Sequence, residues 1–392
     1  MFKISNATFY NRHNREIEKY LIDKNSLHIV SKNSEKKISN NYSKKIIVET
    51  SNLKSLKKLN TQNKFERILL TDVIENHDDV FTLLLTLEKL LTVDGKLIIT
   101  SINPKYIPIF KLFEFLKLKD SNPKNSYIHP KKIENITSGA SLEYQKYFTR
   151  QYIPFKIFNI GNFLNTVFEL IFSPFNLGIK TYMIFRPVVS TNRTLSKSII
   201  IPAKNEEGNL KELVSRIPRL DNTEIIFSYG KSSDDTLKVM KEISSSEDYF
   251  QFKIVSQTKV GKANAVWEAL DVVENEVIAI LDADISVEPE NLTDFFEIIE
   301  KNRADFVNGT RLVYEMDKNS MRFLNKLGNR FFQFFISKII KEPLTDSLCG
   351  TKVFKKSYLN DLYLWQELLP TNDPFGDFDL IFSAAYSDQK IV

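Results

Sequence analysis

The chain has 392 residues, which is too long for one ordinary core. Of these residues 42% are hydrophobic and 26% charged, a composition typical of soluble globular proteins. The formal net charge of +5 is modest for this length, and no cluster interleaves Arg with aromatic residues, so we expect no nucleic-acid partner. The single cysteine, Cys349, excludes an internal disulfide, and His13, His28, His77 and His129 show no metal-ligand spacing.

The beginning of the chain, MFKISNATFYNRHNREIEKY, is too polar for a signal peptide. The most apolar later stretch, residues 160–185, is interrupted by Asn, Glu, Ser and Pro and lacks the unbroken apolar length that a bilayer span needs. We therefore expect a cytoplasmic protein and leave contact with the inner face of a membrane open.

Short β-like runs are predicted in the first half of the chain at residues 26–30, 44–49, 67–73, 96–102 and 179–187. Between them, residues 78–93 carry apolar positions at helical spacing. The sequence Val93-Asp94-Gly95 is expected to end this helix.

The polar stretch Val188–Lys197 marks the predicted domain boundary, which gives a domain at 1–188, a linker at 189–197 and a second domain at 198–392. In the second domain a strand, a turn and a helix follow one another three times, and residues 276–286 hold a fourth strand. This alternation predicts a parallel sheet covered on both faces, with a ligand at the carboxyl ends of its strands.

Asp282 and Asp284 follow an apolar run that we interpret as a buried strand. Carboxylate oxygens are the ligands that Mg²⁺ and Mn²⁺ prefer, and a divalent cation would neutralise two crowded carboxylates. A solvated turn is the alternative for a bare D-x-D sequence, which occurs again at Asp377 and Asp379. The position at a strand end favours a metal-binding role.

Further candidates follow neighbouring strands. Asn205 and Glu206 would grip a base or ribose, or Asn205 would merely cap the next helix. Ser232 and Asp234 lie at a helix start, a place that suits anions or simple capping.

Lys262, beside Gly261, is a candidate phosphate contact, with a solvated Lys as the alternative. Arg311 follows another apolar run and would pair with a diphosphate. These residue types together indicate a site for an anionic ligand.

Residues 198–392 resemble family 2 glycosyltransferases with the GT-A type fold, and most closely their dolichol-phosphate mannose synthase-like branch. The motifs that carry the resemblance are IIIPAKNEEGNL, GKSSDDT, VGKANAV, ILDADISVEPENL, NGTR, DSLCGTKVF and FGDFDLIFSAA. The resemblance implies a metal-dependent, inverting transfer of a sugar from a nucleotide-diphosphate donor to an acceptor hydroxyl or polyprenyl phosphate.

The resemblance also assigns roles to residues. Asp282 and Asp284 would hold Mg²⁺ or Mn²⁺, and Asp346 would lie on the acceptor side. The implied donor-binding residues are Pro202, Ala203, Asn205, Glu206, Ser232, Asp234, Gly261, Lys262, Asp282, Ala283 and Arg311.

Asp377 is the favoured catalytic base, because GDFDLIF aligns it with the second position of the E-D-x-D-L motif that the family often carries, and Asp379 is the rival. The chain departs from the family at Tyr229, where an acid is common, and at Ser286, where a third polar ligand is frequent. It also stops where the family continues, so we expect a C-terminal domain truncated at its end.

The first half resembles a class I S-adenosylmethionine-dependent methyltransferase, over about Tyr10 to Pro187 and most specifically over Ile68 to Pro104. The implied fold class is therefore α/β with two Rossmann-like domains, an N-terminal methyltransferase-like domain and a C-terminal GT-A nucleotide-diphospho-sugar transferase domain. The Gly-rich cofactor loop is absent from SLHIVSKNSEKK, and one strand–helix unit is missing before Ile68. We therefore expect a scaffold that does not bind S-adenosylmethionine.

Two alternatives stay open. In the first, the chain is bifunctional, with an active methyltransferase domain in which Glu49 binds the cofactor ribose. In the second, the chain is a non-catalytic scaffold in a polysaccharide pathway. The aromatic face of residues 329–340 would either pack in a core or meet a membrane.

Overall fold

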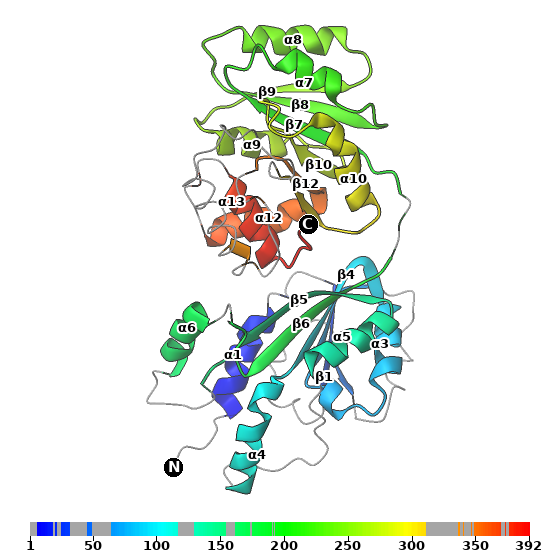
Figure 1. The fold of residues 1–392 in the computed structure, drawn as a ribbon, viewed down its shortest axis with the longest axis vertical. Helices are drawn as coiled ribbons and strands as arrows, with labels where there is room; N and C mark the ends of the chain where they lie inside the picture. Colours follow the sequence, from blue (N-terminus) through cyan, green and yellow to red (C-terminus); the bar gives the residue numbers. More distant parts are fainter. Residues whose placement is uncertain are drawn as a thin grey trace, which may run out of the picture. The chain divides into compact units, whose positions relative to one another are not determined.

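The structure is a computed structural model. It describes residues 6–18, 20–21, 25–31, 45–48, 64–116, 129–153, 161–172, 175–189, 191, 193–310, 336–337, 340, 346, 349–369, 373 and 376–392. The chain divides into two compact units, Met1–Val188 and Val189–Val392, which we call the N-terminal unit and the C-terminal unit (Figure 1).

The N-terminal unit is built on a six-stranded sheet with the order β2-β1-β3-β4-β6-β5. Its strands are β1 (Ser26–Ser31), β2 (Lys45–Val48), β3 (Phe65–Thr71), β4 (Leu91–Ile102), β5 (Leu142–Arg150) and β6 (Lys180–Pro187). Strands β2, β1, β3 and β4 are parallel, whereas β6 is antiparallel to both β4 and β5. Because β2 and β3 lie on opposite sides of β1, the sheet reverses its direction of winding between β1 and β3.

Helices pack on both faces of this sheet because alternate residues of each strand point to opposite sides. Ile68 and Leu70 of β3 join a core with Leu83 and Leu84, whereas Leu69 joins a second core with Ile17. Among the described residues, the helices of this unit are α1 (Asn6–Glu18), α3 (Val80–Glu88), α4 (Ile107–Phe115), α5 (Pro130–Gly139) and α6 (Gly161–Phe172), with short 3-10 turns η2 (Ile74–Asn76) and η3 (Pro104–Tyr106).

The predicted end of the helix at residues 78–93 is wrong. Helix α3 begins after Asp79, whose side chain accepts a hydrogen bond from Thr82 N, and it ends at Glu88. Leu91 is already buried in the sheet and is paired with Phe65 of β3. Strand pairing therefore uses backbone that the apolar spacing had assigned to the helix.

The C-terminal unit contains a second six-stranded sheet, with the order β11-β12-β10-β7-β8-β9. Its strands are β7 (Lys197–Ala203), β8 (Thr223–Tyr229), β9 (Gln251–Ser256), β10 (Val277–Ile280), β11 (Phe306–Asn308) and β12 (Lys352–Lys355). Strands β10, β7, β8 and β9 are parallel, as predicted, but β12 is antiparallel to β10 and β11 and makes the sheet mixed at this edge. Each unit thus combines a sheet with helices, which confirms the predicted α/β class.

Helices cover both faces of the second sheet. Ile199 and Ile201 of β7 face the helices α7 (Leu210–Arg216), α8 (Thr236–Ser246) and α10 (Leu292–Glu300). Ile200 and Ile278 face α9 (Lys262–Leu270), α12 (Leu359–Leu368) and α13 (Asp377–Tyr386). The chain winds from β7 outward to β8 and β9 and then crosses to β10 on the other side of β7, so the switch point lies between β7 and β10.

Candidate active site

Two strand ends meet at the switch point of the C-terminal unit. Strand β7 ends at Ala203 and β10 ends at Ile280, and Leu281 N donates to Ile200 O at 2.9 Å, which continues the pairing one residue further. Asp282 is therefore the first residue to leave the sheet. In open α/β sheets, ligands bind in the crevice at such a point.

Asp282 forms an ion pair with Lys262, the first residue of α9, with 2.5 Å between Lys262 Nζ and Asp282 Oδ1. Both side chains are largely shielded from solvent, since Lys262 is 28% exposed and Asp282 16%. A methyl group on Gly350 would overlap the Asp282 carboxylate and the Lys262 ammonium. Glycine at this position therefore lets the backbone before β12 approach the pair closely.

Asp377 begins α13 after Gly376, which has the left-handed φ of +79°. Lys352 of β12 is fully buried and lies with its Nζ 3.4 Å from Asp377 Oδ1, and it also donates to the Cys349 carbonyl. We call Asp282, Lys262, Asp377 and Lys352 the charge cluster, in which two ammonium groups lie among carboxylates.

Burial and charge act in opposite directions on Lys262. Burial alone would lower its pKa, but the carboxylates of Asp282, Asp377 and Asp284 outweigh this effect, and the net pKa is raised. Burial raises the pKa of Asp377, and the ammonium groups of Lys352 and Lys262 offset only part of the increase. Lys262 thus stays charged at neutral pH, and Asp377 is a better proton acceptor than an ordinary Asp.

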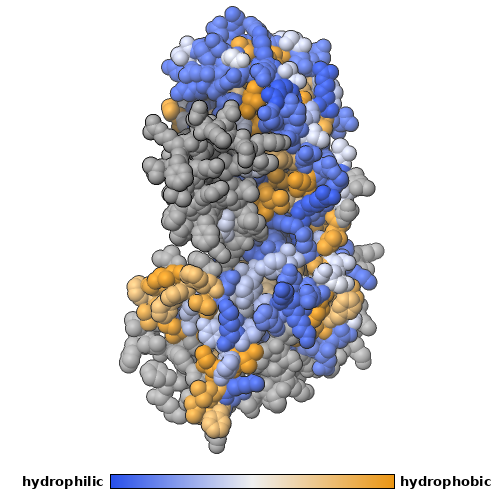
Figure 2. Space-filling model, viewed as in Figure 1, coloured by the Kyte–Doolittle hydropathy of each residue, from blue (hydrophilic) through white to orange (hydrophobic). Residues whose placement is uncertain are grey.

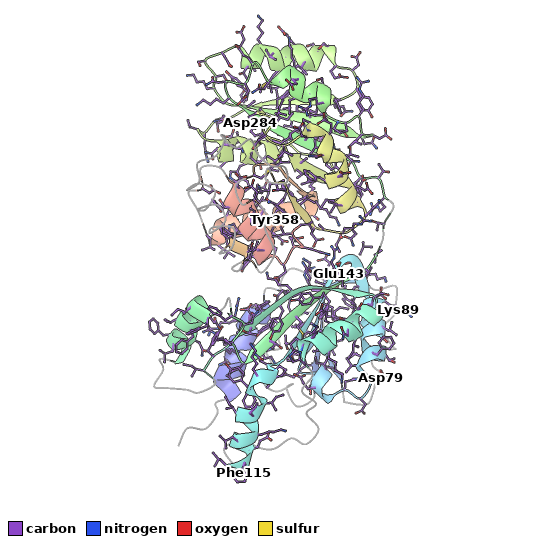
Figure 3. The ribbon with its side chains drawn as sticks, viewed as in Figure 1. Asp79, Lys89, Phe115, Glu143, Asp284 and Tyr358 are labelled. Carbon is purple, nitrogen blue, oxygen red and sulfur yellow. The ribbon has the colours of Figure 1, made fainter. Side chains whose placement is uncertain are left out.

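Asp284 is exposed and lies in a tight turn after Asp282, and its Oδ1 accepts a hydrogen bond from Ser286 N at 3.0 Å (Figure 3). Ile285, which lies between Asp284 and Ser286, has a φ of +56°, which is rare for a β-branched residue. Its side chain packs against the core beside β7 and β10. Packing therefore holds the turn and the two carboxylates in a strained conformation.

These carboxylates partly fit a divalent cation. Asp282 Oδ1 is buried, and the Lys262 ammonium of the ion pair lies beside it. Among the described residues no group of three or more His, Cys, Asp or Glu is arranged to hold a metal ion. Two carboxylates suit Mg²⁺ or Mn²⁺ only if water and ligand phosphates complete the coordination.

Asn205 and Ser232 tie the loops after β7 and β8 together. Asn205 N donates to Ser232 Oγ at 3.0 Å, and Asn205 Oδ1 accepts from Ser233 N at 2.8 Å. The alternative that Asn205 caps α7 is wrong, because Asn209 precedes that helix and Asn205 has a φ of +57°. These side chains lie at the carboxyl edge of the sheet, where β7 and β8 end.

Asp234 and Glu206 are also engaged in these loops. Asp234 accepts from Thr236 N at 3.1 Å and from Glu207 N at 3.3 Å, and bonds with Thr236 lower its pKa. Glu206 accepts from Asn209 Nδ2 at 2.7 Å. Both are thus placed at the predicted edge with partners from the chain itself.

The remaining donor-side candidates are backbone positions at the same edge. Pro202 is paired with Ser228 in the sheet, and the buried Ala203 accepts from Gly230 N at 2.9 Å. Gly261 precedes α9 with a φ of +116°, and Ala283 is buried between the two carboxylates.

The structure separates the two rival base candidates. Asp377 faces Lys352, whereas Asp379 accepts from Trp365 Nε1 of α12 at 3.3 Å. Residues two apart on a helix point in nearly opposite directions. The charge cluster therefore includes Asp377 and leaves Asp379 out.

Asp346 is fully buried, and its main-chain oxygen accepts from Asn308 Nδ2 at 2.7 Å. Arg311 and Glu49 lie outside the described residues. Most of residues 329–340 also lie outside them, but Ile336 and Ile340 are buried in the core beside α9 and α13.

Sequence reasoning missed Lys352 and Gly350, although both lie in the motif DSLCGTKVF. A Lys in a strand is normally solvated, and only the pairing of Lys352 with Ile280 and Asn308 places its side chain inside. The motif itself indicated that these residues matter, but the sequence alone does not predict that β12 pairs antiparallel with β10 and β11.

Within the described part of the chain, no helix has both the length and the apolar character needed to cross a bilayer.

Comparison with known proteins finds a family model that matches part of this unit. Residues 198–363 match the model for glycosyl transferase family 2, which confirms the predicted resemblance over that range. Dodecaprenyl-phosphate galacturonate synthase of Rhizobium johnstonii is 23% identical over 190 residues, 46% of this chain and 55% of that protein. Dolichol-phosphate mannosyltransferase of Pyrococcus furiosus is 34% identical over 134 residues, 33% of this chain and 37% of that protein.

The chain thus spans about half or less of the length of these two relatives. Among solved structures, glucosyl-3-phosphoglycerate synthase from Mycobacterium tuberculosis with Mn²⁺, uridine diphosphate and phosphoglyceric acid is 18% identical. That match covers 50% of this chain and 67% of the other, with a TM-score of 0.38.

We predict that Lys262→Met destabilises the C-terminal unit by about 1–3 kcal/mol at pH 8, between the values for exposed and for fully buried ion pairs. The stabilising contribution of Lys262 is present below its ordinary pKa of 10.5 and is lost only above it, because the folded-state pKa is raised. The loss should shrink at about pH 4, where protonation of Asp377 removes charge from the carboxylates left behind.

The measurement is urea unfolding followed by Trp fluorescence, since Trp267 and Trp365 both lie in the C-terminal unit. An equal loss at both pH values would mean that Lys262 stabilises the fold through its methylene groups and not through its charge.

Proposed function

We propose that the C-terminal unit transfers a sugar from a nucleotide-diphosphate donor to a polyprenyl phosphate. Residues 198–363 match the model for glycosyl transferase family 2, and the comparisons indicate an enzyme of the glycosyltransferase type. The observation that carries the proposal is the charge cluster at the switch point between β7 and β10, in a mixed sheet whose strands β10, β7, β8 and β9 are parallel. Donors of this kind are anionic, and the strand ends offer the ammonium of Lys262 together with two carboxylates suited to a cation.

The donor diphosphate is proposed to lie against Lys262 and the turn of Asp282 and Asp284. When bound there, Mg²⁺ or Mn²⁺ neutralises the charge that develops on the leaving nucleoside diphosphate. The loops that Asn205 and Ser232 join would hold the nucleoside. Arg311, which lies outside the described residues, remains a proposed partner of the diphosphate.

The transfer is proposed to be a single displacement with inversion at the anomeric carbon. The bond from the acceptor oxygen to the anomeric carbon forms while the bond from that carbon to the diphosphate oxygen breaks. If the acceptor is a hydroxyl, Asp377 takes its proton, since burial raises the pKa of Asp377. An ionised phosphate acceptor needs no base, and Asp377 then orients Lys262 through its charge.

The acceptor class is taken from the relatives. Those from Rhizobium johnstonii and Pyrococcus furiosus are named for polyprenyl phosphates, as is an undecaprenyl-phosphate transferase of Proteus mirabilis that is 23% identical over 178 residues. Asp346 is proposed to support the acceptor side through the loop before β12. Polyprenyl phosphates are membrane lipids, so we propose that the protein acts at the inner face of a membrane.

The N-terminal unit is proposed to be a methyltransferase-like scaffold that does not bind S-adenosylmethionine. In the described residues a single strand, β2, lies between β1 and β3 along the chain. The carboxyl end of β3 is occupied by the chain's own polar groups, because Asp72 forms an ion pair with the buried Lys180. Burial and the neighbouring Asp72 raise the pKa of Glu75 to about 7, although Lys180 opposes them.

Titration calorimetry of the full-length protein with S-adenosylmethionine tests the scaffold proposal, and no heat of binding is expected. Micromolar binding that Glu49→Ala abolishes would instead establish the bifunctional alternative.

The transferase proposal predicts release of a nucleoside diphosphate from at least one UDP- or GDP-sugar when Mn²⁺ and a polyprenyl phosphate are present. Replacing Mn²⁺ by a chelator should abolish the release. Asp284→Asn should reduce it at least about 100-fold, because one of the two carboxylate ligands is lost. If no donor in the panel turns over or binds, the transferase proposal fails and the non-catalytic scaffold takes its place.

The two Asp residues of α13 make a matched pair. Asp377→Asn should lower kcat/KM at least about 100-fold, because the neutral amide neither orients Lys262 nor balances the charge of the buried Lys352. Asp379→Asn should change kcat/KM less than about threefold, since its carboxylate faces Trp365. A larger loss for Asp379→Asn, in a variant that unfolds like wild type, would reverse the assignment.

A further inference from the structure

Helix α4 of the N-terminal unit presents large apolar side chains to solvent. Ile109, Leu112, Phe115 and Leu116 are 44%, 53%, 81% and 52% exposed, and their spacing places them along one side of the helix. Phe110 points into the unit and is 6% exposed. Phe115 lies at the outer end of α4 (Figure 3).

A second segment of the same unit, α6 and the turn before β6, also exposes large apolar side chains. Phe163 and Ile171 of α6 are 69% and 53% exposed, and Phe175 and Leu177, in the turn before β6, are 65% and 39% exposed. In Figure 2 the regions of α6 and α4 are coloured hydrophobic on this face of the unit.

The start of α4 lies beside the turn before β6, because hydrogen bonds join them. Tyr106, directly before α4, donates its hydroxyl to Leu177 O, and Asn103 Nδ2 donates to Gly178 O at 2.8 Å. We call the exposed apolar side chains of the two segments the apolar rim, which consists of Ile109, Leu112, Phe115, Leu116, Phe163, Ile171, Phe175 and Leu177. Exposed apolar groups gathered in this way mark an interaction surface.

Charge indicates what the rim contacts. The N-terminal unit has 29 Lys and Arg against 17 Asp and Glu, a formal net charge of +12, whereas the whole chain has only +5. The C-terminal unit is therefore acidic, at −7. Lys105 and Lys111 are exposed beside the apolar side chains of α4.

We propose that the apolar rim inserts into the headgroup region of an anionic lipid bilayer and holds the protein on the membrane surface. Short helices with exposed Phe and Leu and flanking Lys bind such surfaces by combining apolar burial with attraction to anionic lipid. The strongly basic unit favours an anionic surface over the same unit of a second copy, which would carry the same charge. Only the purpose of membrane binding rests on the proposed function, since binding would bring the C-terminal unit to a lipid-linked acceptor.

Co-sedimentation of the full-length protein with vesicles tests the proposal. Vesicles of phosphatidylcholine with phosphatidylglycerol should bind the protein, and vesicles of phosphatidylcholine alone should bind it much less. The double variant Leu112→Glu/Phe115→Glu should weaken binding at least about tenfold, and Phe163→Glu on α6 should weaken it independently. Val93→Glu is the matched control, because Val93 is 44% exposed near the start of β4, whereas α4 follows the end of that strand.

Three outcomes would overturn the proposal. One is the absence of binding to anionic vesicles. Another is binding that about 0.5 M salt abolishes and that the Glu variants leave unchanged, which would mean that charge alone, without apolar insertion, holds the protein on the vesicle. The third is a protein dimer in light scattering that the Glu variants dissociate without vesicles. Circular dichroism of each variant checks folding, and nucleotide release in detergent on the same samples reports the transferase separately.

Discussion

The ion pair between Lys262 and Asp282 is the contact on which the C-terminal unit's candidate site depends. It joins the start of α9 to the end of β10, and the backbone at Gly350 packs directly against it. Asp377 and Lys352 extend the pair toward α13 and β12. A shared hydrophobic core brings these elements together, and the charges buried where they meet are paired with opposite charges, as burial requires.

The balance of charge in this region gives the site its chemical character. Three carboxylates, Asp282, Asp284 and Asp377, lie near two ammonium groups, of which Lys352 is fully buried and Lys262 only partly so. The carboxylate on the open side, Asp284, is the exposed one. The exposed carboxylate of Asp284 is thus suited to a further cation that arrives with an anionic ligand. The buried ammonium of Lys352 is suited to holding Asp377 in place.

Much of this arrangement could be predicted from the chain because it follows from local patterns. An apolar run that ends in Asp282 and Asp284 indicates a buried strand with carboxylates at its end, and the structure has that strand in the centre of the sheet. Alignment favoured Asp377 and left Asp379 as a rival, whereas helical geometry separates the two side chains. The left-handed backbone of Asn205 and the inward side chain of Lys352 depend on contacts that no local pattern encodes.

The most direct test of this account is calorimetric titration of the full-length protein with UDP and with GDP, in Mn²⁺ and again in chelator. The account predicts that at least one of the two nucleotides binds in Mn²⁺, and that this binding is lost both in chelator and in Asp284→Ala. Equal affinity with and without the cation would contradict the central claim that the strand end holds its donor through a divalent ion.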